Sequence, residues 1–329
     1  MNIDFLQPRR WLLLILLLTG STALQQAVAC TTTASDINLG TTSSLTLPTT
    51  TSQAAGAGGL TCAGSLQLLT GVYLRATLLS NTLVLTGDQG GSVPFTVYSD
   101  SGYTQAMLTG QTATLSAANL LAIGGSGISV PLYARTQLGA NVPAGTYTGT
   151  ISVRWYWAIC PSGVLNICTW DTSPGVVQPT GLGCVLNCTP TNWGTGELAQ
   201  ISIKLIVTKA CQLSTLSAVD FGAQALVSQF AQRTQTVVVR CTNTEGFTLG
   251  FGNGQNYQAP WRQLASGSNR LRYNIYRTDG TTIVNTAAPF PAIGTGASQS
   301  FDFKAIIDPT QANVPVGTYI DNVVLTVSY

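Results

Sequence analysis

The sequence predicts an all-β protein made of two β-sandwiches with immunoglobulin-like architecture. Short runs in which apolar and polar residues alternate recur along the 329 residues, and 34 glycines interrupt any pattern long enough for a stable amphipathic helix. The motif Val-Pro-x-Gly-Thr-Tyr begins at Val142 and again at Val314. An alternating run follows the motif both times, as is typical of a strand with one buried face. Two copies of one β-rich unit therefore predict two sandwich domains.

The first 29 residues indicate a signal peptide. Arg9 and Arg10 precede an apolar stretch, residues 11–18, that is too short to cross a bilayer, and small residues occupy 27–29. We therefore expect cleavage before Cys30, followed by export through the periplasm. A lipid anchor on Cys30 is an alternative, disfavoured because Ala27 stands where a lipoprotein signal usually carries leucine.

The repeat divides the exported part of the chain into residues 30–208 and residues 209–329. The first copy continues through an insert to one more alternating run, in which the apolar residues are Ile201, Ile203, Leu205 and Val207. The second copy has no such run after its motif-bearing strand. We therefore expect the second sandwich to lack its last strand and to be completed by a strand from a donor subunit or a chaperone. The accepting edge would carry Val323, Leu325, Val327 and Tyr329.

All eight cysteines lie in the exported part, so we expect disulfides formed in an oxidising compartment. Two pairs occupy matching places in the two copies, which predicts Cys30–Cys62 and Cys211–Cys241. The other four cysteines lie in the insert of the first copy, where three pairings are possible. The economical one is Cys160–Cys168 with Cys184–Cys188.

Composition argues against catalysis and against nucleic-acid binding. The chain has no histidine, which removes Ser-His-Asp and Cys-His nucleophiles and most zinc sites. Its 12 acidic residues are scattered, without a cluster suited to a glycosidase or a metal ion. A net charge of +2 with 8% charged residues leaves no basic patch for nucleic acid. We expect no enzyme activity, no cofactor and no metal.

The insert between Trp155 and Trp193 carries short apolar steps flanked by turn-forming residues or cysteines. Loops normally present polar side chains, so apolar side chains held out at loop tips favour contact with another surface. The candidate adhesive residues are Val164, Leu165, Ile167, Val176, Val177, Val185 and Leu186. In the alternative, these side chains cap the sandwich or pack against the aromatic residues 155–157.

Several motifs resemble the spore coat protein U domain family. In the second copy these are Cys-x-Leu-Ser at Cys211, Asp-Phe-Gly at Asp220, Val-Arg-Cys-Thr-Asn at Val239 and the terminal motif at Val314. The first copy resembles a diverged, enlarged form of the same domain. The family occurs in subunits of archaic chaperone-usher pili, and the two-domain layout is similar to the tip adhesins of such pili. The resemblance implies a periplasmic chaperone, an outer-membrane usher and a strand-donating neighbouring subunit as partners.

The expected function is a tip adhesin that supports surface attachment and biofilm formation from the end of a pilus. Cleavage before Cys30 leaves no segment to donate, so we expect the subunit to accept a strand and to end the fibre. The surface bound would be abiotic or a host cell. One alternative is a structural pilus or secreted coat subunit without an adhesive role. Another is a lectin in which Trp155, Trp157, Trp170 and Trp193 line a sugar groove.

Overall fold

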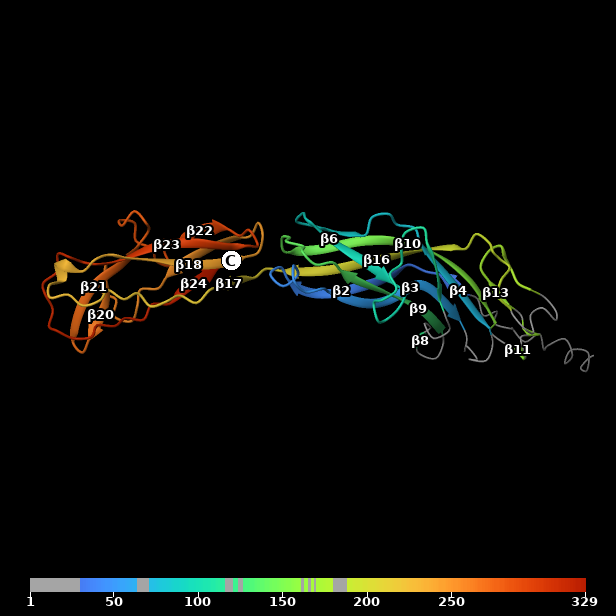
Figure 1. Cartoon of the computed structure of the whole chain (residues 1–329), viewed down its shortest axis with the longest axis horizontal. Coiled ribbons are helices and arrows are strands. Elements are labelled where there is room, and N and C mark those ends of the chain that lie inside the picture. The colour runs from blue at the N-terminus through green and yellow to red at the C-terminus, as the bar shows by residue number, and fades with distance from the viewer. Residues whose placement is uncertain are drawn as a thin grey trace, which may run out of the picture.

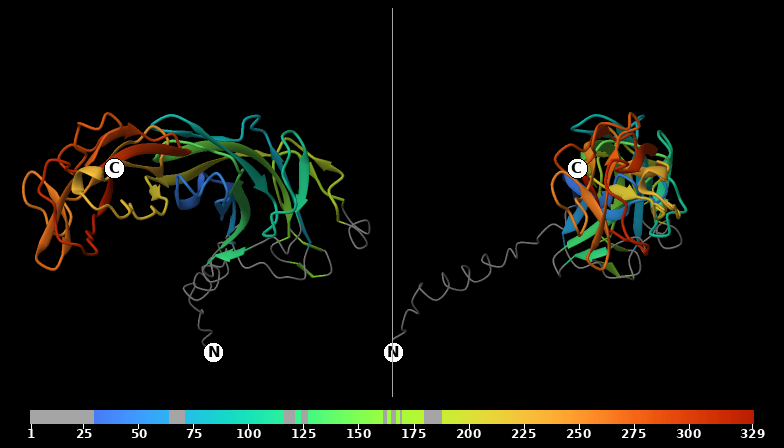
Figure 2. Two further views of the ribbon diagram at one scale, coloured as in Figure 1. Left: turned by 60° about the vertical axis from the view of Figure 1, so that its left-hand side comes forward. Right: turned by 90° about the vertical axis from the view of Figure 1, so that its left-hand side faces the viewer.

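A computed structural model of the chain describes residues 30–329 apart from 64–70, 116–120, 124–126, 161–162, 165–166, 169 and 180–187. The predicted signal peptide lies outside the described residues. The described part is all-β, as predicted, and forms two units that lie end to end (Figure 1) and overlap when viewed along the long axis (Figure 2). Each unit has its own hydrophobic core. Within the described ranges, no helix is long and apolar enough to cross a membrane.

The first unit is a sandwich of two layers joined by a shared strand. One layer has β3 and β9 at its centre and the other has β10 and β16, and β5 pairs with both β6 and β10 to link them. Its strands are β1 (Cys30–Thr32), β2 (Ser35–Ser43), β3 (Gln53–Ala63), β4 (Val72–Leu78), β5 (Val84–Gly87), β6 (Ser92–Tyr98), β7 (Thr112–Leu115), β8 (Leu121–Ile123), β9 (Gly127–Thr136), β10 (Gly145–Ile159), β11 (Gly163–Val164), β12 (Ile167–Cys168), β13 (Asp171–Thr172), β14 (Val176–Val177), β15 (Asn192–Trp193) and β16 (Glu197–Thr208).

Strand β16 is the alternating run that the sequence predicted after the insert. It lies between β10, to which it runs antiparallel, and β2, to which it runs parallel. Its alternating apolar residues face the core and are almost completely buried, namely Ala199, Ile201, Ile203, Leu205 and Val207, whereas Leu198 is exposed. The first sandwich is therefore closed by a strand of its own chain.

The second unit repeats this plan with fewer strands. Its two sheets have the orders β17-β18-β23-β21-β20 and β22-β19-β24. The strands are β17 (Cys211–Leu213), β18 (Arg233–Cys241), β19 (Gly246–Phe251), β20 (Arg262–Ser266), β21 (Asn269–Tyr276), β22 (Phe290–Ile293), β23 (Ser298–Ile307) and β24 (Leu325–Ser328). Strand β24 pairs with β19 as β10 pairs with β4. Among the described residues, no strand pairs along the other edge of β24.

The repeated motif forms the same hydrogen bond in both units. The hydroxyl of Tyr147 donates to the carbonyl oxygen of Pro143 over 2.7 Å, and that of Tyr319 donates to the carbonyl oxygen of Pro315 over 2.7 Å. The proline lacks an N–H, and its carbonyl needs a donor where the chain turns into the strand. This shared contact makes Tyr147 and Tyr319 equivalent positions.

Both disulfides predicted from the matching copies are present. Cys30 and Cys62 face each other across β1 and β3, and Cys211 and Cys241 face each other across β17 and β18. Cys160 and Cys188 are buried and disulfide-bonded. The predicted pairs Cys160–Cys168 and Cys184–Cys188 lie outside the described residues, because they involve side chains that the structure does not describe.

The junction between the units is short and hydrogen-bonded. Lys209 and Ala210 alone separate β16 from β17. The hydroxyls of Ser44 and Thr242, both buried, hydrogen-bond across the junction over 2.6 Å. Asn141 of the first unit also donates to the carbonyl oxygen of Thr295 over 2.9 Å. These contacts link the two units directly across the junction.

Candidate functional site

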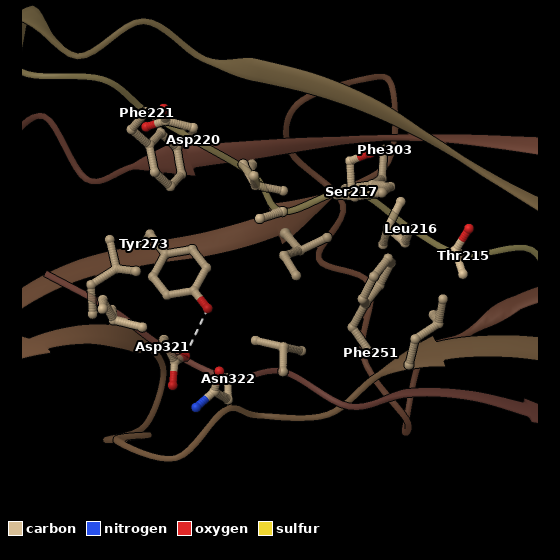
Figure 3. A pocket seen from close by; sticks show the side chains of 18 of the residues that line it. Thr215, Leu216, Ser217, Asp220, Phe221, Phe251, Tyr273, Phe303, Asp321 and Asn322 are labelled. Atoms are coloured by element: carbon tan, nitrogen blue, oxygen red, sulfur yellow. Dashed lines mark hydrogen bonds between the residues drawn. The ribbon is translucent and has the colours of Figure 1, made fainter.

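A groove of about 950 Å³ opens along the second unit between residues 213–221 and residues 319–325 (Figure 3). The first of these segments follows β17 and has no regular secondary structure beyond Leu213, and the second leads into β24. Apolar side chains make up most of the lining, and they are Leu213, Leu216, Ala218, Val219, Phe221, Phe251, Leu264, Ile275, Phe303, Ala305, Ile320, Val323 and Leu325. An extended apolar groove along an unpaired strand edge is the geometry of a site for an added strand.

The groove occupies the place that β16 fills in the first unit. There, Tyr147 and Gly149 of β10 pair with Leu205 and Ile203 of β16. Further along, Ile151 and Val153 pair with Ile201 and Ala199. The equivalent residues of the second unit are Tyr319, Asp321, Val323 and Leu325, and all four line the groove. Among the described residues no segment takes the place of β16 there.

The structure brings together part of the accepting edge that the sequence predicted. Val323 and Leu325 form one wall of the groove, and Val327 is packed against the core beside it, paired with Leu249. Tyr329 lies outside the lining and is 55% exposed. Sequence reasoning missed the opposite wall, where the apolar residues Leu216, Val219 and Phe221 were the available signal.

One end of the groove is polar. The hydroxyl of Tyr273 donates to Oδ2 of Asp321 over 2.7 Å (Figure 3). The backbone N–H of Gln255 donates to Oδ1 of Asp321 over 2.8 Å. Burial raises the pKa of the Tyr273 hydroxyl well above its ordinary value, and the hydrogen bond and charge of Asp321 add to this shift. Tyr273 therefore remains a hydrogen-bond donor at any physiological pH.

A buried arginine lies beneath this polar end. Arg262 is 1% exposed, and its guanidinium donates to the carbonyl oxygens of Gly252 and Val284 over 2.8 Å and 3.0 Å. Burial lowers its pKa, while the nearby tyrosines and Asp321 oppose that shift. The cation is satisfied by backbone oxygens together with Oδ1 of Asn274, and its charge and that of Asp321 attract each other through space.

The insert of the first unit lies at the end of the molecule away from the second unit, where β11 and β13 are found (Figure 1). In its β14–β15 hairpin, Val177 is 52% exposed, whereas Val176 is half-buried and pairs with Trp193. The ring of Trp193 in turn covers the guanidinium of Arg75 at 4.2 Å. Of the two valines, Val177 therefore presents an apolar side chain to solvent.

The remaining adhesive candidates belong to parts of the insert that the structure describes incompletely. Val164 and Ile167 pair in the β11–β12 hairpin, but their side chains are outside the described residues. Leu165, Val185 and Leu186 lie wholly outside the described residues.

The sugar groove lined by four tryptophans is contradicted by the burial of two of them. Trp155 and Trp157 are 0% and 2% exposed, and they belong to the core of the first unit. The indole N–H of Trp155 donates to the carbonyl oxygen of Gly58 over 2.7 Å. Their alternation along β10 signalled a buried face, which is the structural role that the sequence also allowed.

The described residues contain no group of three or more cysteine, aspartate or glutamate side chains that could hold a metal ion.

Comparison with solved structures finds one of similar fold that contains a pilus subunit. A chain of the crystal structure of the CsuC–CsuE chaperone–tip adhesion subunit pre-assembly complex, from archaic chaperone-usher Csu pili of Acinetobacter baumannii, is 22% identical with a TM-score of 0.61. The match covers 92% of this chain and 100% of that one. The CupB6 tip adhesin from Pseudomonas aeruginosa is 11% identical, with a TM-score of 0.37 and coverage of 92% of this chain and 93% of that one. No curated protein sequence matches the chain.

The family comparison covers both repeats. The model of the Spore Coat Protein U domain matches residues 17–154 and again residues 197–326. The two matches leave out most of the insert, which is therefore the part in which this chain departs from the family. The chain belongs to the Spore Coat Protein U domain family.

Proposed function

We propose that this chain is an adhesin subunit of a chaperone-usher pilus, in which residues 209–329 accept a strand and residues 30–208 present an adhesive end. The observation that carries the proposal is the groove of the second unit, which has the position that β16 occupies in the first. The similar structure from Acinetobacter baumannii is described as a complex of a chaperone with a tip adhesion subunit, and this supports a periplasmic chaperone as the first occupant. A neighbouring subunit would then donate the strand at the outer-membrane usher.

The strand that fits can be specified from β16. It runs antiparallel to β24 and carries apolar side chains at every second position, so that they enter the groove while the alternate side chains face solvent. Its backbone would satisfy the free edge of β24, which otherwise offers unpaired N–H and C=O groups. Such a strand adds main-chain hydrogen bonds and apolar burial together.

The test is a full-length mature chain extended after Tyr329 by a flexible linker and a copy of residues 199–207. Each apolar side chain that enters the groove contributes about 1.5–3 kcal/mol, so the melting temperature of the second unit is expected to rise by about 10 °C or more. A matched extension in which the residues copied from Ile201 and Leu205 are serine is the control. If both extensions leave the melting temperature unchanged, the groove does not accept a strand.

The adhesive role is proposed for the apolar side chains at the distal end of the first unit. Val177 supports it, because its side chain is 52% exposed and an apolar side chain exposed at that end favours contact with another surface. When many pili attach at the same time, such contacts at their adhesive ends act together and give useful attachment even when each contact is weak. Surface attachment and biofilm formation would follow from this end of the molecule.

The test replaces Val177, Val185 and Leu186 together with serine in the natural pilus. Assembly is expected to be normal, because the proposal puts these side chains on the surface, where a substitution changes stability little, while attachment of the piliated cells to polystyrene falls severalfold. High salt is expected to leave the attachment of the parent unchanged, because charge does not drive it. The matched control is Val176→Ser, which alters a half-buried side chain of the same hairpin and is expected to lower thermal stability instead. Normal attachment by the triple variant would favour a structural or coat subunit without an adhesive role.

A further inference from the structure

The two units differ in chemistry at one point of otherwise equivalent architecture. In strand order, β21 takes the place of β6, and β20 takes the place of β5. Tyr273 pairs with Ile307 of β23 as Phe95 pairs with Thr136 of β9, so Tyr273 corresponds to Phe95. By the shared motif, Asp321 corresponds to Gly149 of β10.

The same alignment places an arginine of the second unit where the first unit has a leucine. Arg262 pairs with Tyr273, and the backbone N–H of Phe95 donates to the carbonyl oxygen of Leu83, so Arg262 corresponds to Leu83. Where the closed first unit has phenylalanine, leucine and glycine, the open second unit has tyrosine, arginine and aspartate. Polar groups of this kind weaken a core unless each finds a partner, so their presence beneath a strand-binding groove calls for a reason.

The position of Asp321 suggests a reason for these polar groups. In the first unit, Gly149 pairs with Ile203 of β16, so this isoleucine meets no polar side chain at that register. A side chain at Gly149 would lie 2.9 Å from the carbonyl oxygen of Val84. In the second unit, the residue of an added strand at this register would meet the carboxylate of Asp321. Cross-strand neighbours lie about 4.5–5.5 Å apart at Cβ, which is within reach of a hydrogen bond between side chains.

The carboxylate has capacity for a further donor. Two of its roughly four acceptor positions are used by the Tyr273 hydroxyl and the Gln255 N–H. Asp321 is half-buried in the open groove and would lose its remaining water when a strand covers it. An apolar side chain opposite would then leave a desolvated charge partly unsatisfied, whereas a hydroxyl, amide or ammonium group would satisfy it.

We propose that Asp321 is a selectivity position of the groove, which favours a donated strand bearing a hydrogen-bond-donating side chain opposite it and disfavours one bearing an apolar side chain. The inference rests on the proposed strand-accepting function. The proposal also means that a strand with the sequence of β16, which would place Ile203 opposite Asp321, is not the best fit for the groove in the second unit of another copy of this chain. Mispairing between copies of this chain is thereby disfavoured.

The experiment uses synthetic peptides copied from residues 199–207, added to the full mature chain. At the position of Ile203, two peptides carry valine or threonine, which have nearly the same shape and strand preference and differ by a hydroxyl. We expect the threonine peptide to bind about tenfold more tightly to the parent chain. The same pair of peptides at the position of Ile201, which would face Val323, is the control and is expected to show the opposite preference.

Substitution of the host residue completes the test. In Asp321→Ala, the preference for threonine at the Ile203 position is expected to vanish or reverse, while the preference at the Ile201 position persists. Asp321→Asn keeps the side-chain shape and serves if the alanine variant fails to fold, with a smaller preference expected. Equal binding of the two peptides to the parent, or a preference that survives both substitutions, overturns the inference and leaves strand acceptance intact. Failure of every peptide and of the tethered extension to bind would instead overturn the proposed function.

Discussion

At the scale of single residues, the two equivalent tyrosines make a matched pair. Tyr147 and Pro143 are both buried, whereas Tyr319 is half-buried and Pro315 is exposed. Tyr147→Phe leaves the carbonyl oxygen of Pro143 without its donor in a place water does not reach, at a cost of about 1–3 kcal/mol. Water can replace the lost hydroxyl in Tyr319→Phe, so that variant is expected to lose about 1 kcal/mol or less. Calorimetry that resolves the two unfolding transitions measures both losses, and equal losses would contradict the assignment.

Two buried tyrosines, Tyr147 and Tyr273, give the molecule an alkaline limit. Burial raises the pKa of Tyr147, with the charge of Asp88 adding to the effect, and Tyr273 is shifted in the same direction. Because the folded pKa lies above the unfolded value of about 10, the stability is fully present below that pH and is lost as pH rises above it. The free energy of unfolding is therefore expected to fall above about pH 10, and the fall should be shallower in Tyr147→Phe. Urea titrations at a series of alkaline pH values measure it.

At the scale of elements, the disulfide of β17 and β18 anchors one wall of the groove. Cys211 and Cys241 are separated by 30 residues, and the wall at 213–221 follows β17 directly. Replacing both cysteines with alanine is expected to lower the stability of the second unit by about 3–4 kcal/mol and to weaken its response to the tethered strand. The control replaces Cys30 and Cys62, separated by 32 residues, and should affect the first transition instead. An unchanged response in the first variant would show that the wall forms without its anchor.

Strands with one buried face were predictable from sequence, and irregular walls were not. The alternation from Ile201 to Val207 predicted β16, since every second residue of a strand with one buried face is apolar. Beyond Leu213, which ends β17, the wall carries apolar residues without that period and pairs with no strand of the described part. The contact between Asp321 and Tyr273 joins residues far apart in the sequence, and a single aspartate in an alternating run signals nothing by itself.

At the scale of the whole molecule, the junction decides whether the two units act as one body. Besides its bond to Ser44, the hydroxyl of Thr242 accepts a hydrogen bond from the backbone N–H of Ala210 over 2.8 Å. One buried side chain thus ties together the first unit, the linker and the second unit. The ion pair between Lys209 and Glu245 is largely exposed and adds little to this connection.

Thr242→Val keeps the shape of this side chain and removes its hydroxyl, so the variant isolates the junction from the cores. We expect the melting temperatures of the units to change little while the distribution of interdomain distances in small-angle X-ray scattering broadens, because Ser44 then has no partner across the junction. The matched control is Thr236→Val, which removes an exposed hydrogen bond to Asp302 within the second unit and should leave the distribution unchanged.

Gly296→Ala is a second way to open the junction, because the φ of 73° at Gly296 disfavours a side chain and the added methyl group would collide with Asn141. A rigid junction means that a pull on the second unit enters the first through β16, which is held on both sides by β10 and β2. The hydrogen bonds of β16 to both neighbouring strands then share the load. If the distance distribution is unbroadened in both junction variants, the rigidity of the junction comes from other contacts, and Thr242 does not determine how force passes between the units.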